Sequence, residues 1–114
     1  MPKRSNRGRV IRPRHIYVIV LRKGVLEDRR FKKKNLHYQG RRLCLYVGLS
    51  WLKPEERFQQ HLDGVHPSRI VRRYGKRVLA SRCKQITSLY ETALKRERQH
   101  AQQLREEGYA VWQN

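Results

Sequence analysis

Apolar residues in this chain gather into short runs, and the spacing within each run predicts a local structure. Residues 16–21 are β-branched, aromatic or aliphatic without interruption, which predicts a strand in the centre of a sheet. Apolar and other residues alternate over 42–49, so this stretch predicts a second strand that ends near Gly48. In 68–79 the apolar positions fit either a third strand or two short pieces with a turn at Gly75.

Two other stretches have helical patterns. A proline followed by two glutamates predicts a helix start, so we expect a helix over 54–62 that stops at Gly64. From about residue 84 the apolar positions follow a period of about 3.6 residues, and Gly108 ends this long helix. Residues 109–112 then predict a short terminal strand or a packed tail. This order indicates an α/β (α+β) fold in which helices flank a small three-stranded sheet, mixed or partly antiparallel.

The helix over 54–62 presents two faces with different chemistry. Phe58 and Leu62 are one turn apart and predict the face that packs on the core. Arg57 and His61 are also one turn apart, on a neighbouring face, so both side chains can point into one site.

Basic residues dominate two segments outside these elements. Residues 1–14 carry six lysines and arginines and no acid, which predicts a flexible arm that either lies along a phosphate backbone or remains a solvated tail. Residues 22–42 carry nine basic residues against two acids and predict a long hairpin insertion, with extra β-structure near Phe31 and over residues 36–38. We therefore expect one folded domain over residues 15–112, preceded by the arm.

The net charge narrows the choice of partner. The chain has 28 Lys and Arg against 9 Asp and Glu, a formal net charge of +19. Such a chain repels itself unless it meets a polyanion, and nucleic acid fits because neutralising its phosphates releases counterions. The sequence offers neither a basic amphipathic helix with a bulky aromatic face nor a run of about 20 apolar residues, so we expect no membrane partner. DNA is the expected partner, held mainly through its backbone, and RNA is possible.

Twelve basic residues in the insertion and in the stretch after Gly64 are the candidates for contact with the DNA backbone. They are Arg29, Arg30, Lys32, Lys33, Lys34, Arg41, Arg42, Arg69, Arg72, Arg73, Lys76 and Arg77. Cys44 and Cys83 lack the spacing of a zinc site and are expected to be buried free thiols in a reducing, intracellular setting such as the cytoplasm or nucleoid. A chain of this size could also gain affinity for DNA by forming a homodimer.

Side chains that can assist phosphodiester hydrolysis occur in and around the predicted strands. The reaction needs an activated water, charge stabilisation at the phosphate and help for the leaving oxygen. Tyr17 and Tyr46 offer phenols, Arg57 offers a guanidinium and His61 an imidazole. Each also has an ordinary structural interpretation, as sheet packing for the tyrosines and as helix surface for the other two.

Acids are scarce, which narrows the choice of a metal ligand. Magnesium can be held by one carboxylate, with water and substrate oxygens filling its shell. Glu91 is the only acid between Gly64 and Arg96, and it neighbours Tyr90 on the helical segment that packs. Glu97 falls where the helix is expected to face solvent. Glu91 is therefore the candidate ligand, and the alternative is a lone exposed glutamate.

The order and spacing of these residues resemble the GIY-YIG nuclease superfamily. His15-Ile16-Tyr17 stands where the family has GIY, and Tyr46-Val47-Gly48 stands where it has YIG. The segment from Ser50 to Arg57 is similar to the family's serine or threonine, proline and arginine segment, and His61 continues it as R-x-x-x-H. The resemblance covers about residues 15–112.

This resemblance implies a small mixed sheet flanked by helices and a DNA endonuclease that uses a divalent metal, Mg²⁺ or Mn²⁺. Tyr17 would be the general base for the attacking water, with Tyr46 shaping the site or assisting the proton transfer. Arg57 would stabilise the charged transition state, and His61 would orient the phosphate or move a proton. Glu91 would hold the metal.

A second hypothesis is a protein that binds nucleic acid without cutting it, or a basic component of an RNA–protein assembly, on the same scaffold. The two hypotheses differ in the geometry that they require. A nuclease needs Tyr17, Tyr46, Arg57, His61 and Glu91 to converge on one shallow electropositive cleft. A Glu91 side chain that points away from Arg57 and Tyr17 would count against cleavage.

Overall fold

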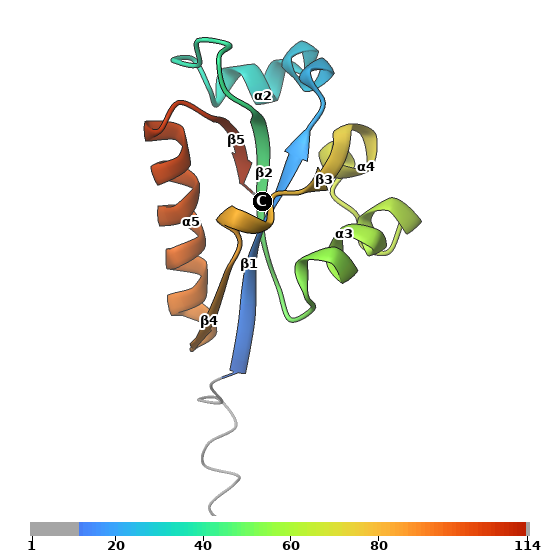
Figure 1. Ribbon diagram of the computed structural model, residues 1–114, viewed down its shortest axis with the longest axis vertical. Helices are drawn as coiled ribbons and strands as arrows, with labels where there is room; N and C mark the ends of the chain where they lie inside the picture. Colours follow the sequence, from blue (N-terminus) through green and yellow to red (C-terminus); the bar gives the residue numbers. More distant parts are fainter. Residues whose placement is uncertain (1–11, 114) are drawn as a thin grey trace, which may run out of the picture.

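The computed structural model describes residues 12–113 of the chain (Figure 1). It is a mixed α/β structure in which helices flank one open, mixed sheet of five strands. The predicted fold class is confirmed, with a sheet that has two more strands than the three expected. Most of the predicted arm lies outside the described residues, and Arg12–Arg14, which were assigned to it, already belong to the first strand.

Strand β1 (Arg12–Leu21) is the centre of the sheet. It pairs antiparallel with three strands: β2 (Cys44–Ser50) along its length, β4 (Lys84–Ser88) at its start and β3 (Gly75–Val78) at its end. The fifth strand, β5 (Ala110–Gln113), pairs parallel with β2. Residues 16–21 are 2% exposed or less, because a strand in this position is covered on both faces.

The two faces of the sheet are covered by different helices (Figure 1). Helix α5 (Tyr90–Glu106) packs on one face, where Val18, Leu45 and Leu104 share a hydrophobic cluster. Helices α3 (Pro54–Asp63) and α4 (Arg69–Tyr74) pack near the other face, and Tyr17 and Tyr46 lie on that side. Because side chains alternate along a strand, these tyrosines and Leu45 point to opposite sides.

The predicted insertion over 22–42 holds two short helical segments, and the expectation of extra β-structure near Phe31 and over residues 36–38 is wrong. It contains a short 3₁₀ helix, η2 (Lys23–Glu27), and helix α2 (Arg29–Lys33). The Asp28 carboxylate caps α2 by accepting hydrogen bonds from the backbone N–H groups of Arg30 and Phe31, at 2.9 and 3.1 Å. The Phe31 side chain is fully buried, so this turn is anchored in the core.

Two further segments have a different secondary structure from the one predicted. The first part of 68–79 is helix α4, because the Ser68 hydroxyl caps it by accepting from the backbone N–H of Val71. After a 3₁₀ turn, η3 (Ala80–Arg82), the segment predicted to begin the long helix is strand β4 instead. Its pairing with β1 outweighs the helical pattern.

Helix α3 begins and ends as the sequence predicts. Pro54 is its first residue, and Gly64 ends it with a left-handed φ of 82°. Phe58 packs against the core as expected. The expectation for Leu62 is wrong, since its side chain is 38% exposed and the buried residue of this turn is His61.

Strand β5 lies at an edge of the sheet, and a side chain forms hydrogen bonds with its outward-facing backbone. The buried Asn35 amide accepts a hydrogen bond from the Val111 backbone N–H at 2.7 Å and donates one to the Val111 carbonyl at 3.1 Å. It thus makes the two bonds that a neighbouring strand would make to this residue.

The two cysteines are free thiols, with Cys44 buried and Cys83 half-buried. Within residues 12–113, no helix has the length and apolar character to cross a membrane.

Candidate active site

The position of Tyr17 depends on a glycine on the neighbouring strand. Tyr17 of β1 faces Gly48 of β2 in the antiparallel register. A Cβ atom placed at Gly48 would lie 2.5 Å from the Tyr17 hydroxyl oxygen, closer than any real contact. The tyrosine ring therefore lies directly across the glycine, and this close approach explains why position 48 has no side chain.

His61 of α3 holds the Tyr17 hydroxyl in place. The His61 Nε2 atom lies 2.8 Å from the Tyr17 hydroxyl, and the Ser68 backbone N–H donates to His61 Nδ1 at 2.9 Å. Because Nδ1 accepts a hydrogen bond, the ring proton of the neutral imidazole is on Nε2 and is donated to Tyr17. Burial, with the nearby Arg57 charge, lowers the pKa of His61 to about 4, so the imidazole is neutral at physiological pH.

Tyr46 completes an aromatic cluster with these two residues. Its ring centroid lies 5.9 Å from that of Tyr17 and 5.7 Å from that of His61. Burial raises the pKa of both phenols. Side-chain hydrogen bonding between them lowers the pKa of Tyr46 and raises that of Tyr17.

Arg57 supplies the positive charge beside this cluster. Its guanidinium donates to the backbone carbonyl groups of Val65 and His66, at 3.0 and 2.7 Å, and to the Gln60 side chain at 3.1 Å. These three bonds fix the guanidinium between α3 and the loop that follows it. Its charge lowers the pKa of Tyr17 as well as that of His61, so it lies within electrostatic reach of the cluster.

Glu91 does not join the other four predicted residues. It lies in the first turn of α5, on the opposite side of the sheet from α3, and its side chain is exposed. The structure thus brings together two phenols, an imidazole and a guanidinium, without the predicted carboxylate.

A different carboxylate on α5, that of Glu97, is buried against the sheet. Glu97 is only 3% exposed, and its Oε1 accepts a hydrogen bond from the Gln113 side chain at 3.3 Å. Burial raises the pKa of Glu97 to about 7, and its charge raises the pKa of Tyr46. The expectation that Glu97 faces solvent is wrong.

Glu97 could have been found from the periodicity of its helix. The buried positions of α5 are Ala93, Glu97, His100, Ala101 and Leu104. Their spacing is that of one helical face, and Glu97 is the only acid on it. An acid on the buried face of a helix, such as Glu97, is a stronger indication of function than Glu91, which was chosen because no other acid lies nearby in the sequence.

Glu97 also lines a hollow of about 260 Å³ between the end of β2 and the start of α5. Arg14, Trp51 and Tyr90 form other parts of its wall. The described residues contain no group of three or more His, Cys, Asp or Glu side chains that could hold a metal ion. A cation here would therefore bind one carboxylate, with water and substrate oxygens completing its shell.

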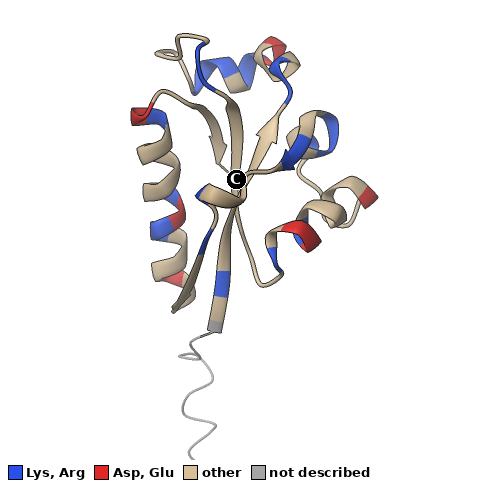
Figure 2. Cartoon of the chain, in the orientation of Figure 1, with Lys and Arg blue, Asp and Glu red and all other residues tan. Residues whose placement is uncertain are grey.

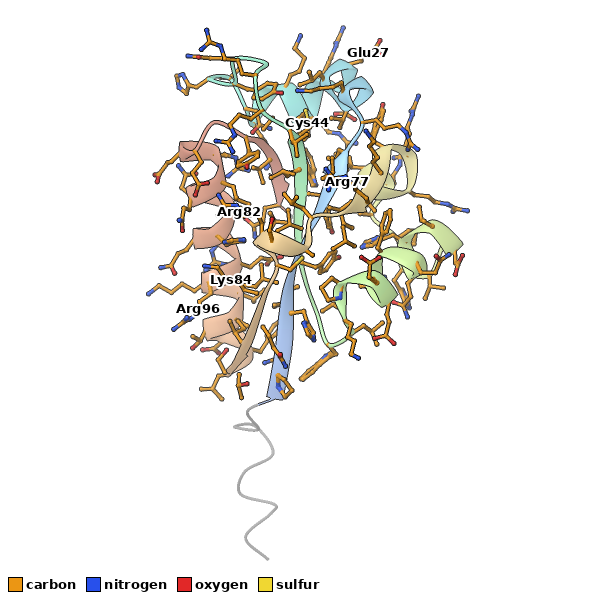
Figure 3. The ribbon with its side chains drawn as sticks, viewed as in Figure 1. Glu27, Cys44, Arg77, Arg82, Lys84 and Arg96 are labelled. Atoms are coloured by element: carbon orange, nitrogen blue, oxygen red, sulfur yellow. The ribbon has the colours of Figure 1, made fainter. Side chains whose placement is uncertain are left out.

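The twelve basic residues predicted to contact DNA are all exposed. Four of them, Arg30, Arg69, Arg72 and Arg73, line one hollow of about 330 Å³ between α2 and α4. Figure 2 shows the basic segments of α2, α4 and β3 together in the upper part of the molecule. The labelled Arg77 extends this group along β3 in Figure 3.

The chain was also compared with known proteins. No family model, no curated protein and no solved structure matched it.

Proposed function

We propose that this protein hydrolyses phosphodiester bonds in DNA with the help of a divalent metal ion. The observation that carries the proposal is the environment of Tyr46. The ring of this buried phenol packs against the Tyr17 ring and the His61 imidazole, at centroid distances of 5.9 and 5.7 Å, and three hydrogen bonds fix the Arg57 guanidinium beside them. Titratable side chains with shifted pKa values, gathered from separate elements, are typical of a catalytic site.

Tyr46 is the proposed proton acceptor for the attacking water, in place of Tyr17. The His61 N–H bond to Tyr17 occupies one lone pair of the Tyr17 oxygen, which leaves the Tyr17 O–H to donate toward Tyr46. A donated hydrogen bond stabilises the Tyr46 phenolate. Tyr17 and His61 thus position and activate Tyr46, while the Arg57 charge favours both the phenolate and the phosphate transition state.

Glu97 is the proposed ligand for Mg²⁺ or Mn²⁺. A buried carboxylate with a raised pKa is poorly stabilised in its charged form, and a bound cation would supply the missing stabilisation. Such a cation would polarise the phosphate and promote ionisation of water. The remaining coordination positions would be filled by water and by substrate oxygens.

The proposed substrate follows from the charge and its placement. A net charge of +19 favours a polyanion, and the arginines between α2 and α4 offer several planar groups that can each bind a phosphate with two hydrogen bonds. These contacts would be to the backbone and would carry little sequence preference.

A second candidate function is binding to nucleic acid without cleavage, and one observation favours it. The side chains of Tyr17 and Tyr46 are only 2% and 1% exposed, so neither hydroxyl meets solvent freely in this conformation. Under this alternative the cluster would be a polar part of the core, and only the basic surface would act.

Incubation with plasmid and branched DNA, with Mg²⁺ or Mn²⁺, separates the two functions. We expect cleavage by the wild type and a large loss of cleavage for Arg57→Ala and Glu97→Gln. Glu91→Gln is the matched control on the same helix and should cleave like the wild type. Absence of cleavage by the wild type, or equal cleavage by all four proteins, would refute the proposal.

A further inference from the structure

Two exposed aromatic rings stand at the hollow that Glu97 lines. Trp51 follows the last residue of β2 and is 52% exposed, and Tyr90 is the first residue of α5 and is 56% exposed. Both line the hollow of about 260 Å³, although they are 39 positions apart in the sequence. Large aromatic side chains that remain exposed around one hollow indicate a binding surface.

A buried arginine lies against both rings. The guanidinium carbon of Arg14 is 4.1 Å from the centre of the Trp51 ring and 5.2 Å from that of Tyr90. Arg14 is 6% exposed, and its Nη1 donates to the Ser88 carbonyl at 2.8 Å. The hydrogen bond ties the guanidinium to β4, so Arg14 holds the two rings at defined positions.

The charge of Arg14 is not paired with an acid among residues 12–113. The ion pairs of this part of the chain involve Arg30 and Arg82. Glu97 lines the same hollow but lies beyond ion-pair distance of the guanidinium. The wall of the hollow therefore carries one guanidinium, one carboxylate and two aromatic rings, each at a separate point.

These groups match the parts of a nucleotide. A base can stack on an exposed aromatic face, and its phosphate can be drawn to the arginine and to a cation on the carboxylate. A base within a duplex already has stacking neighbours on both faces, whereas an unpaired base has a free face to offer. An apolar peptide would supply no counter-charge to Arg14 or to Glu97.

We propose that the Trp51–Tyr90 hollow binds an unpaired base of a DNA strand next to the phosphate to be cut. This inference rests on the proposed nuclease function and adds its substrate class: DNA with an unpaired nucleotide, such as a bulge, a flap or a single-stranded junction. The basic surface holds the backbone of any duplex, and the hollow selects the unpaired position.

Binding to two duplexes that differ by a single base tests the proposal without any cleavage. One fluorescent duplex carries a single bulged thymidine, and its twin carries an abasic residue at the same place. The phosphates and the charge are identical, so only the base distinguishes them. Affinity is measured in EDTA at fixed salt, which prevents cleavage and makes the result independent of catalysis.

We expect the wild type to bind the thymidine duplex about 5- to 100-fold more tightly than the abasic duplex, which is the usual range for stacking of one base. Trp51→Ala and Tyr90→Ala should bring the two affinities together. Trp51→Phe, which keeps a ring, should retain part of the preference. The affinity of every variant for the abasic duplex serves as the check on folding, and it should equal that of the wild type.

Equal affinity of the wild type for the two duplexes would overturn the inference. So would an undiminished preference in Trp51→Ala. The proposed function can fail separately. If the wild type prefers the unpaired base but cuts no DNA with Mg²⁺ or Mn²⁺, the hollow is still a binding site and the nuclease function is refuted.

Discussion

Replacing Glu97 with glutamine should stabilise the protein at alkaline pH and leave its stability little changed at acidic pH. The pKa of Glu97 is about 7 in the fold, against an ordinary value of 4.5. Because burial raises the folded-state pKa, the fold favours the protonated form. This contribution to stability is complete below pH 4.5 and is lost as pH rises through about 7.

The size of the effect follows from the pKa difference. One unit corresponds to about 1.4 kcal/mol, so the wild type should lose about 3 kcal/mol between acidic and alkaline pH through this group. Glutamine does not titrate, and its carbonyl oxygen can still accept the hydrogen bond from Gln113. The stability of Glu97→Gln relative to the wild type should therefore rise by about 3 kcal/mol over this range.

Urea unfolding in EDTA, at a series of pH values from about 4 to 8, measures this difference. Glu91→Gln is the matched control, because Glu91 is exposed on the same helix, and its free energy of unfolding should stay within about 0.5 kcal/mol of the wild type. If the difference in free energy of unfolding between Glu97→Gln and the wild type does not change with pH, the raised pKa of Glu97 is refuted. Added Mg²⁺ should then stabilise the wild type at alkaline pH and leave Glu97→Gln unchanged.

Two further outcomes are expected. Gly48→Ala should lower the free energy of unfolding by about 1–3 kcal/mol, because the new methyl group meets the Tyr17 ring, and DNA cleavage should fall with it. Replacing Arg72 and Arg73 together with glutamine should make the plot of log affinity for duplex DNA against log salt shallower by about 2, since two phosphate contacts are lost.

Each of these changes has a matched control. Gly24→Ala adds the same methyl group where the nearest atom, on the Tyr74 ring, is 3.5 Å away, so its stability should stay within about 0.5 kcal/mol of the wild type. Lys95→Gln with Arg96→Gln removes two charges from α5, where the Arg96 side chain lies apart from α4 (Figure 3), and should leave the salt slope unchanged. Equal effects in variant and control would contradict either prediction.

Local signals in the sequence were sufficient for some elements. Pro54 and Gly64 mark the two ends of α3 through backbone preferences that depend on no distant contact. The uninterrupted run in β1 predicted a central strand, because only a strand covered on both faces is apolar at every position.

Other elements depend on contacts that the sequence does not display. Strand β4 has Ile86 as its only aliphatic residue, so it is a strand because it pairs with β1. In α4, two neighbouring apolar residues, Ile70 and Val71, fit a strand as well as a helix, and the Ser68 cap decides between them.

The candidate site also has a part that local sequence predicts and a part that depends on packing. Arg57 and His61 were predicted together, because one turn of helix necessarily brings them to neighbouring faces. The burial of Glu97 was predicted incorrectly, because it depends on which face of α5 meets the sheet. Only packing determines that rotation.

The hydrogen bonds from Asn35 to Val111 bear on how copies of this chain meet. The edge of a sheet is a template on which another chain can add a strand, and such addition leads to aggregates or to dimers with a continuous sheet. At Val111 the backbone N–H and carbonyl are already bonded to a side chain of the same molecule. Self-association through β5 would first have to displace a buried amide. The Asn35 side chain therefore hinders strand addition at this point of the edge, although β5 contains neither a proline nor a charge.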